Sequence, residues 1–452
     1  MDSAQTRAAD PAEAPHGNFF RDAWDRVLIA GIFAGMAALA WGALSTPMLQ
    51  PLMDIAERQR WGQFWVRPTV IWVSMGLVLM LLRTVLWLLY RPRAAALFEE
   101  APALTVIIPA YNEGAMVMQS IRSAALATYP RDRLEVIVVD DGSRDDTWHY
   151  IETAAAQFPG LVTAIRLPEN LGKRGALAEG IRRAKGEILV TIDSDSVIED
   201  TALLAAAGPF RDPKIGAVAG KVAVLNRREA LIPRMLHVRF MLSFDFLRSA
   251  QSVYRTVFCC PGALTAYRAD LVRHLLPAWE SQTFMGERCT YGEDRALTND
   301  VIAAGYDTVY QRTAVVHTIV PTTYAQLCRM YIRWDRSYIR EEMRFARIVW
   351  RRPLRWRLLA LYESTITNLR FPIAYGAMGL WIANSLADPT SLARMLFAIM
   401  VASTLYALYY LRSERSWDFA FGILYGYFSF FALTWIFPYS AMTLRARGWL
   451  TR

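Results

Sequence analysis

The chain has 452 residues, of which 54% are hydrophobic and 20% are charged, and its net charge is +9. This length suits two or three structural units, and the composition favours a folded domain joined to membrane segments over a purely soluble protein. A positive charge suits nucleic acid, phosphate-bearing substrates or a membrane surface, but the long apolar stretches argue against nucleic acid. The four cysteines have no C-x-x-C spacing, which predicts free thiols in a reducing compartment.

Two apolar stretches follow an N-terminal tail, residues 1–26, that has no signal-peptide pattern. Residues 27–47 and 70–90 are each long enough to cross a bilayer, which takes about 20 residues. We therefore predict two transmembrane helices within residues 27–90. Arg91 and Arg93 follow directly and mark the cytoplasmic end.

Residues 103–320 have a sequence pattern that is typical of a cytosolic α/β domain. Short β-branched runs alternate with helical stretches, which predicts a mostly parallel sheet with flanking helices. In such sheets the ligand binds beyond the carboxyl ends of the strands. The polar segments that fall at these ends are Tyr111-Asn112-Glu113, Asp140-Asp141-Gly142 and Asp193-Ser194-Asp195.

The D-x-D of Asp193 and Asp195 suggests a metal site. Carboxylate oxygens suit Mg²⁺ or Mn²⁺, which also takes substrate phosphates as ligands and offsets the charge on a diphosphate leaving group. A lone D-x-D is usually a solvated loop. Here it is the third acidic strand end in a series, which favours the functional interpretation.

Two further segments suit a nucleotide. Asp140 and Asp141 could accept hydrogen bonds from a base or ribose, or form an ordinary Asp-Gly turn. Lys173 and Arg174 follow Gly172 and suit phosphate contact, or simply begin a basic helix.

A second acidic pair lies in Gly292-Glu293-Asp294-Arg295. Sugar transfer needs a base that takes the proton of the attacking hydroxyl, and Asp294 is our candidate. The alternative is an exposed N-cap of the helix that follows, because Asp is a good cap.

Two segments are candidates for the membrane surface. Residues 231–249 are amphipathic and predict an interfacial helix or a surface helix packed on the domain's own core. Residues 321–357 carry an arginine stripe, and we expect Arg333 and Trp334 in the active site and the later arginines on lipid headgroups. The members of the stripe on one helical face are Arg329, Arg333, Arg336, Arg340, Arg344 and Arg347.

Residues 358–452 predict about three transmembrane helices and a short basic tail. Counting spans puts that tail outside, against the positive-inside tendency, so either a span is miscounted or Pro438 breaks the last one. Glu363 and Arg370 lie on one helical face of the first of these spans. They could pair, line a polymer path or both be interfacial.

The motif order resembles the family 2 processive glycosyltransferases, with the closest likeness to hyaluronan synthases and the rhizobial nodulation chitooligosaccharide synthase. The likeness covers residues 104–341. The motifs that carry it are Pro109-Ala110-Tyr111-Asn112-Glu113, Asp140-Asp141-Gly142-Ser143, Asp193-Ser194-Asp195, Gly292-Glu293-Asp294-Arg295 and Arg333-Trp334.

The resemblance implies a GT-A fold and an inverting single displacement. It assigns the uridine end to Ala110, Tyr111, Glu113 and Asp141. It gives Lys173 to the nucleotide, Asp193 to the diphosphate and Asp195 to the metal, Mg²⁺ or Mn²⁺. Asp294 would be the base, grouped with Glu293 in the catalytic pair. Arg333 would contact the pyrophosphate and Trp334 would be a platform for the acceptor.

Two positions differ from the family's pattern. Met330 stands where a glutamine precedes the Arg-Trp pair. Cys259-Cys260-Pro261-Gly262 replaces a Cys-x-Gly-Pro order, and we leave these four residues out of the predicted catalytic set.

The expected function is therefore a membrane-embedded hexosyltransferase of a bacterial inner membrane, with its catalytic domain in the cytoplasm. It would polymerise N-acetylglucosamine-containing, hyaluronan-like or chitin-like units from UDP-sugars and export the polysaccharide through its own spans. One alternative is transfer of a single sugar to a lipid carrier, and a remote one is a degenerate scaffold. The expected partners are the UDP-sugar, the growing polysaccharide and the bilayer, without nucleic acid, and the oligomeric state stays open.

Overall fold

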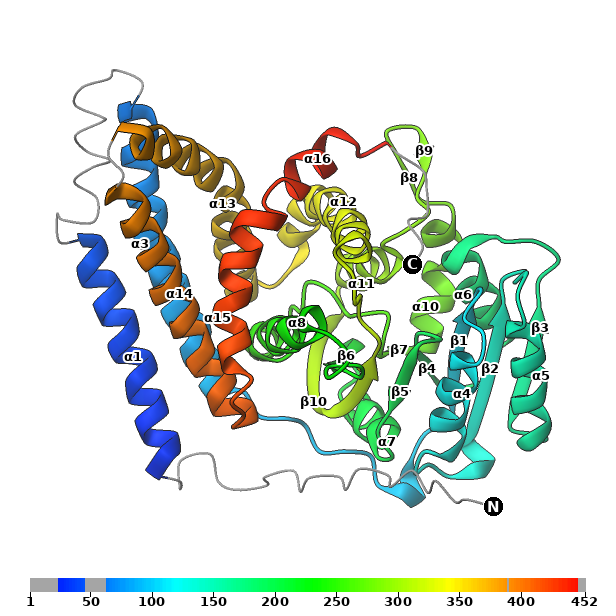
Figure 1. The fold of residues 1–452 in the computed structure, drawn as a ribbon. Coiled ribbons are helices and arrows are strands. Elements are labelled where there is room, and N and C mark those ends of the chain that lie inside the picture. The colour runs from blue at the N-terminus through cyan, green and yellow to red at the C-terminus, as the bar shows by residue number, and fades with distance from the viewer. Residues whose placement is uncertain (1–22, 45–61, 388–389, 446–452) are drawn as a thin grey trace, which may run out of the picture.

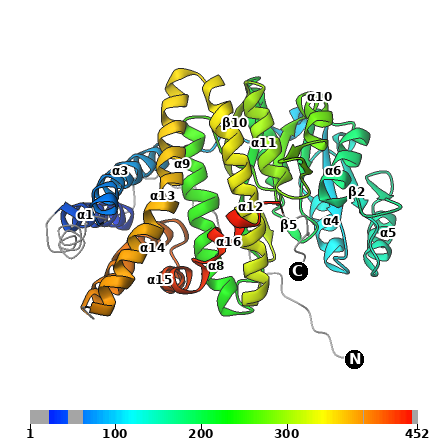
Figure 2. The same cartoon turned by 90° about the horizontal axis from the view of Figure 1, so that it is seen from above.

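The computed structural model describes residues 23–44, 62–387 and 390–445. The structure has two parts, a sheet with flanking helices and a bundle of long apolar helices (Figure 1). Figure 2 shows helices α8, α9 and α12 standing between the bundle and the sheet. Most of the predicted tail 1–26, with Arg447 and Arg452 at the other end, lies outside the described residues.

The sheet has eight strands in the order β3-β2-β1-β4-β7-β6-β10-β5. Strands β3, β2, β1, β4, β6 and β10 run in one direction, and β7 and β5 run against their neighbours. The mostly parallel sheet predicted from the sequence is therefore confirmed. The bounds are β1 Leu104–Ala110, β2 Leu134–Asp140, β3 Val162–Arg166, β4 Ile188–Thr191, β5 Ser196–Ile198, β6 Ile215–Val224, β7 Thr265–Arg268 and β10 Asp307–Thr318. A separate hairpin pairs β8 Thr283–Phe284 with β9 Glu287–Arg288.

Helices cover both faces of the sheet, which is why β1 is buried at every position. Val106 and Ile108 face one core, and Ile107, on the opposite side of the pleat, faces the other. The first core includes α4 Met116–Leu126, α5 Thr147–Gln157 and α7 Ala202–Ala207. The second includes α6 Gly172–Arg183, α10 Ala269–Glu280 and α11 Glu293–Ala303.

Residues 231–253 form a broken helix between the sheet and the bundle. Helix α8 (Leu231–Met241) packs on α15 and β6, a π-helical turn spans Leu242–Phe246, and α9 (Leu247–Val253) packs on α3 and β10. His237, Asp245 and Arg248 are buried, and Asp245 accepts from Arg312 Nε at 2.7 Å, whereas Arg234 is exposed. These three polar side chains therefore face the protein interior, which favours a helix packed on the domain's own core.

Helix α12 (Tyr324–Ile348) begins with a capping box in which Thr323 and Gln326 exchange hydrogen bonds. It packs between α11 and α16 (Ile436–Met442). A single 3₁₀ turn, Val349–Arg351, connects it toward α13.

Three of the later arginines of the stripe, Arg336, Arg340 and Arg344, bind protein groups, whereas Arg347 is exposed. Arg340 and Arg344 form ion pairs at 2.9 Å with Glu341, and Arg344 also pairs with Asp300 at 2.7 Å. Arg336 donates to Thr443, and Arg352 pairs with Asp307 at 2.6 Å. The headgroup prediction is therefore wrong for the stripe residues Arg336, Arg340 and Arg344, because their guanidiniums are bound by groups of the protein.

The bundle contains α1 Ala23–Leu44, α3 Gly62–Leu89, α13 Leu354–Ala387, α14 Thr390–Glu414 and α15 Phe419–Phe428. Among the described residues, one helix, Met395–Glu414, is long and apolar enough to cross a membrane. A second candidate is α15 and α16 taken together, and shorter apolar helices span Arg26–Ala38 and Ser74–Leu89. The five predicted crossings therefore stay a prediction.

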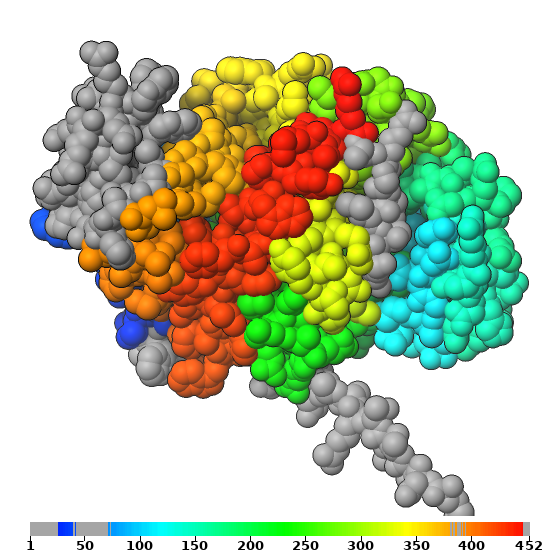
Figure 3. Space-filling view, turned by 45° about the horizontal axis from the view of Figure 1, so that its top comes forward, coloured from blue at the N-terminus to red at the C-terminus, as the bar shows by residue number. Residues whose placement is uncertain are grey.

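The last apolar block bends by 43° between Leu433 and Ile436. Pro438 cannot hydrogen-bond to the carbonyl of Thr434, and that carbonyl accepts from Tyr375 Oη at 2.7 Å instead. After the bend, α16 lies against α12 (Figure 3). There Ser440 Oγ donates to Ile332 O. The described end of the chain is therefore beside α12, and the bend agrees with the alternative that Pro438 breaks the last span.

The ionisable residues of α13 do not pair with each other. Glu363 is 3% exposed and forms an ion pair at 3.0 Å with Arg83 of α3. Arg370 lies over the ring of Phe371 at 4.6 Å. Of the alternatives left open for Glu363 and Arg370, mutual pairing is wrong, because Arg83 of a helix distant in sequence pairs with Glu363 instead.

Candidate active site

The carboxyl ends of β1, β2 and β4 meet at one edge of the sheet. Ala110 is in register with Asp140, and the Asp141 amide donates to Ala110 O at 2.9 Å. The Ile192 amide donates to Ile107 O, which leads β4 to the same edge just before Asp193. The structure thus brings together Ala110, Asp141 and Asp193.

Asp141 is a buried carboxylate at the end of β2. It is 2% exposed, and its Oδ1 accepts from the Leu171 amide at 2.7 Å. Burial raises the pKa of Asp141 to about 6, although the Leu171 and Gly172 amides favour the charged form. Gly142, at φ +70°, is required here because a Cβ would lie 2.9 Å from the carbonyl carbon of Glu169.

The loop that carries Tyr111 and Glu113 is tied to the loop after β2. The Asn112 amide donates to Ser143 Oγ at 3.0 Å, and the Glu113 amide donates to Thr147 Oγ1 at 2.8 Å. These bonds hold Tyr111 and Glu113 beside the Asp141 loop. Sequence reasoning did not single out the two hydroxyls, although an Asp-Gly-Ser turn before a threonine-led helix is a local signal for them.

Lys173, in the first turn of α6, is the centre of a charged cluster. Its ammonium lies 2.5 Å from Asp193 Oδ1 and 3.1 Å from Glu293 Oε1. Burial lowers the pKa of Lys173, but Asp193 and Glu293 outweigh that effect and raise it overall. The lysine therefore stays charged and joins the acids of two distant motifs.

Arg174 has a different role from its neighbour. It is 4% exposed, donates to Trp279 O and stacks on the Trp279 ring at 4.9 Å. The predicted phosphate contact is therefore wrong for Arg174, which is held inside the domain by α10.

The acids of the 292–295 motif lie in the first turn of α11. The residue that precedes the helix is Gly292, at φ +74°, so Asp294 is not the exposed N-cap that we kept as an alternative. Asp294 Oδ1 accepts from the Arg295 amide at 2.7 Å, and Oδ2 accepts from the Gly262 amide at 3.3 Å. The Cys259 thiol lies 3.8 Å from Oδ2.

The two neighbouring carboxyl groups have pKa values shifted in opposite directions. Burial acts to raise the pKa of Glu293, but the Lys173 ammonium outweighs it and lowers that pKa. Burial raises the pKa of Asp294, and the charge of Glu293 raises it further. Such a separated pair is typical of sites that hold one acid charged and use the other for proton transfer.

Sequence reasoning missed the loop 259–262. A Cβ on Gly262 would lie 2.9 Å from Lys173 Nζ and 3.2 Å from Asp193 Oδ1. The loop therefore closes on the cluster, and a side chain at position 262 would displace the ends of Lys173 and Asp193. Its signal was the Pro-Gly turn itself, which we set aside because its order differed.

Asp195 lies at the edge of the same site. Its Oδ1 accepts from Ser196 Oγ and from Thr318 Oγ1, both at 3.2 Å. The structure shows no group of three or more His, Cys, Asp and Glu side chains placed to hold a metal anywhere in its described ranges. The donor set fits a Mg²⁺ or Mn²⁺ ion that takes Asp195 from the protein and completes its shell with phosphates and water.

Helix α12 packs against the motif of residues 292–295, which contains Asp294. A Cβ on Gly292 would lie 1.9 Å from Ser337 Oγ, and Arg340 donates to Tyr291 O at 2.5 Å. Arg333 and Trp334 lie one turn before Ser337 on this helix. These contacts of α12 with the motif are made by Ser337 and Arg340, and the roles of Arg333 and Trp334 in the site stay predictions.

Trp334 is 37% exposed and lies beside aromatic rings rather than acids. Its ring is 5.7 Å from Tyr331 and 6.1 Å from Phe240. Phe240 contacts Phe244, over which Arg248 stacks at 4.1 Å, and Arg248 donates to Cys259 O. A row of rings thus leads from Trp334 to the loop that closes on Asp294.

Comparison with known proteins shows which protein family this chain is similar to. Residues 105–276 match the model described as "Glycosyl transferase family 2". An N-acetylglucosaminyltransferase of Azorhizobium caulinodans is 34% identical over 241 residues, which are 53% of this chain and 60% of that protein. A counterpart in Rhizobium meliloti is 35% identical over 53% of this chain and 56% of its own length. The chain thus matches a little over half the length of these relatives.

A longer match is with a hyaluronan synthase of Streptococcus pyogenes, 30% identical over 356 residues, which are 77% of this chain and 83% of that protein. Among solved structures, a mannosyltransferase from Pyrobaculum calidifontis superposes with a TM-score of 0.57 and 23% identity, over 80% of this chain and 99% of its own. That likeness confirms the expected GT-A type of fold. The sequence matches show that the chain belongs to glycosyl transferase family 2.

Proposed function

We propose that the chain is a membrane-embedded, inverting hexosyltransferase that adds sugar units from a UDP-sugar to a growing saccharide. The observation that carries the proposal is the cluster in which Lys173 joins Asp193 to Glu293, with Asp294 beside it at the end of the sheet. A charged acid, a cation and an acid with a raised pKa are what transfer onto a hydroxyl requires.

In the proposed reaction Asp294 is the general base. Its carboxylate accepts the proton of the acceptor hydroxyl as that oxygen forms a bond to the anomeric carbon of the donor. The bond from this carbon to the phosphate oxygen breaks, and UDP leaves with the electron pair. One displacement inverts the anomeric carbon, and the products are UDP, the lengthened saccharide and a protonated Asp294.

The other site residues bind and orient. Asp141, with Ala110, Tyr111 and Glu113 around it, suits the uridine, because its carboxylate can accept from base or ribose donors. Lys173 and Asp193 lie where the diphosphate would be, and Arg333 and Trp334 extend the site toward the acceptor. Trp334 offers an aromatic face on which a sugar ring can stack.

A divalent cation would be held by Asp195 and the substrate's phosphates, and it would offset the negative charge of the leaving diphosphate. The substitution Asp195→Ala should then weaken the Mg²⁺- or Mn²⁺-dependent part of donor binding. Calorimetric titration of UDP with and without the metal measures this part. Equal metal dependence in the variant and the wild type would argue against the ligand role.

The relatives named N-acetylglucosaminyltransferase and hyaluronan synthase support a donor that contains N-acetylglucosamine. We infer a processive reaction in which the product leaves through the bundle of α1, α3, α13, α14 and α15. The contact of α12 with α16 supports this inference, because it joins the active-site helix to the apolar part. The catalytic domain, 103–320, would face the cytoplasm of a bacterial inner membrane.

A second candidate is transfer of one sugar to a lipid carrier, with the same chemistry at Asp294. The two are separated by incubating the purified protein with UDP-GlcNAc, UDP-GlcA and UDP-Glc, singly and in pairs, and sizing the products. The proposal expects long saccharides, from UDP-GlcNAc alone or only when UDP-GlcA is added. Products limited to single-sugar lipids would refute processive synthesis.

A further inference from the structure

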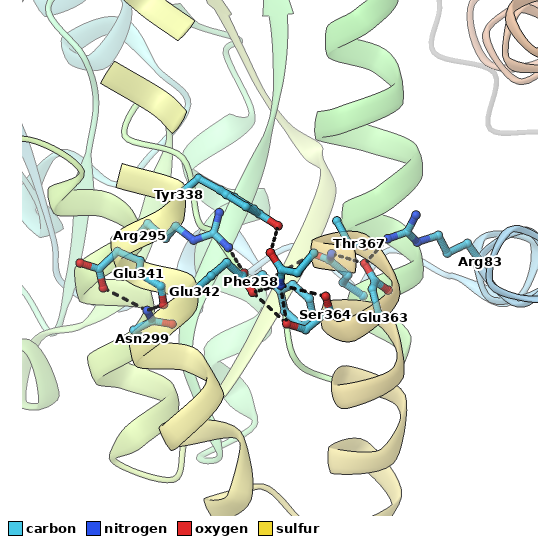
Figure 4. Close-up of polar contacts among 12 residues, drawn as sticks. Arg83, Phe258, Arg295, Asn299, Tyr338, Glu341, Glu342, Glu363, Ser364 and Thr367 are labelled. Atoms are coloured by element: carbon cyan, nitrogen blue, oxygen red, sulfur yellow. Dashed lines mark hydrogen bonds and ion pairs between the residues drawn. The ribbon is translucent and has the colours of Figure 1, made fainter. Parts of the chain in front are cut away.

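Helix α13 of the bundle is connected by two hydrogen-bonded routes to the groups that hold Asp294 (Figure 4). One route reaches the Arg295 amide, which donates to Asp294 Oδ1, and the other reaches Cys259, whose thiol lies against Oδ2. Both routes pass through a buried glutamate.

The first route starts at Arg295. Its guanidinium forms an ion pair with Glu342 of α12 and lies over the Tyr338 ring at 4.6 Å. The other oxygen of Glu342 accepts from Ser364 Oγ and Asn368 Nδ2, both at 2.8 Å and both on α13. Glu342 thus bridges the helix of the candidate base and a helix of the bundle.

The same junction has a second brace. Tyr338 Oη donates to Asn368 Oδ1 at 2.7 Å, so the residue whose ring supports Arg295 is also tied to α13. Asn368 therefore donates to Glu342 and accepts from Tyr338, and both of its partners contact Arg295.

The second route passes through Glu363. This glutamate accepts from Gln251 Nε2 at 2.7 Å, from Tyr254 Oη at 2.8 Å and from Arg83 at 3.0 Å. Gln251 Oε1 in turn accepts from the Phe258 amide at 3.3 Å. Phe258 directly precedes Cys259, so the loop against Asp294 Oδ2 is anchored to α13.

Neither glutamate is needed merely to fill space. Glu342 is 8% exposed and Glu363 is 3% exposed. Burying a carboxylate is costly, and well-packed apolar residues often stabilise a fold as well as a buried ion pair does. What a carboxylate adds is two acceptor oxygens in a fixed geometry, and here each glutamate binds side chains from at least two other elements.

We propose that Glu342 and Glu363 are positioning residues that hold the Asp294 carboxylate in register with its acceptor, so that turnover depends on the placement of α13. The inference rests on the proposed function, since it takes Asp294 as the base. Neither glutamate contacts the candidate substrate site, and each acts through the residues that touch Asp294. A displacement of about 1 Å at such a group can cost about 100-fold in rate.

The test breaks each route at a residue that does not touch Asp294. Asn368→Ala removes a donor to Glu342 and leaves the Arg295–Glu342 pair in place. Gln251→Leu removes the bridge between Glu363 and the Phe258 amide. The matched control is Tyr362→Phe, which removes another hydrogen bond of α13, the one from Tyr362 Oη to Met75 O at 2.8 Å.

For each purified protein in lipid, kcat, the donor KM and the affinity for UDP are measured. We expect each route variant to lower kcat by about tenfold or more, with donor KM and UDP affinity within twofold of the wild type and the control unchanged. Unchanged kcat in both route variants would overturn the inference. So would a fall in kcat that follows an equal loss of UDP-binding protein, since that shows only lost fold.

The two proposals fail in different ways. A wild-type protein that transfers no sugar from any donor would overturn the proposed function, and the inference with it. A wild type that transfers sugar while both variants match it would overturn the inference alone. In Glu342→Gln, only one amide oxygen remains to serve both Arg295 and α13, so this variant should be at least as slow as Asn368→Ala.

Discussion

At the scale of single residues, the position of one lysine separates the roles of two neighbouring acids. The Lys173 ammonium is 3.1 Å from Glu293, and the Asp294 carboxylate is bound instead by the amides of Arg295 and Gly262. Glu293 therefore stays charged, and its charge raises the pKa of Asp294. We therefore assign proton transfer to Asp294, the acid of the pair that is not bound to the Lys173 ammonium.

The pH dependence of turnover follows from the direction of this shift. A general base works when it is deprotonated, so kcat should fall as the pH drops through the raised pKa of Asp294. That fall should begin above the range of an ordinary Asp, about 3.9. Initial rates at saturating donor across the acid range measure it, and a rate that holds constant down to about pH 4 would contradict the assignment.

Gly262→Ala should disturb the cluster without removing any charged group. The new Cβ would meet Lys173 Nζ and Asp193 Oδ1 and push the lysine from its place. We expect kcat/KM to fall by up to about 100-fold. A suitable control is Gly286→Ala, because nothing lies within 4 Å of its Cβ position, although its positive φ strains any side chain. Equal activity of the two variants would refute a close approach at Gly262.

The acids at the strand ends could be found from the sequence because their signal is local. An apolar run that ends in Asp predicts both a strand and the edge at which the Asp lies, as for Asp141 and Asp193. The roles of Gly262, Thr318 and Arg174 depend on contacts across the fold, and no local pattern carries them. Arg174 and Lys173 have the same local sequence context, but only Lys173 lies in the charged cluster. Local sequence alone therefore does not predict which of the two residues belongs to the site.

At the scale of elements, the junction of α11 and α12 decides the geometry of the site. Gly292 permits the close approach of Ser337, and the guanidiniums of Arg340 and Arg344 bind residues at or near the motif. The helical periodicity of the arginines was read correctly as one face. The sequence could not say that this face meets protein, because the acids that pair with it lie 40 or more residues away or on the helix itself.

Gly292→Ala should open this junction. A left-handed backbone costs a residue with a side chain about 1–2 kcal/mol, and the Cβ would also collide with Ser337. We expect a lower thermal midpoint and a loss of transfer. Adding Ser337→Gly removes the colliding atoms and should restore part of the activity, while the single variant Ser337→Gly reports its own cost. No recovery in the double variant would show that the collision is not the cause.

At the scale of the whole molecule, the apolar helices are built into the catalytic domain. The bundle holds α9 through Glu363 and α12 through Asn368, and the last helix returns to α12 after its bend. The two-part organisation was predictable from composition, because apolar stretches of span length differ sharply from an alternating α/β pattern. The packing of α16 back onto α12 was not predictable from the sequence, because a count of spans treats each apolar block as one straight helix.

Sugar transfer by Asp294→Asn tests most directly whether Asp294 is the general base. The variant is compared with wild-type protein in lipid, with the UDP-sugar that the wild type is found to use. We expect this variant to lose at least about 100-fold in transfer, with UDP affinity retained. The control Asp270→Asn, which removes an exposed carboxylate from the ion pair with Arg273, should keep full activity. Transfer by Asp294→Asn at the wild-type rate would show that Asp294 is not the base and would contradict the proposed function.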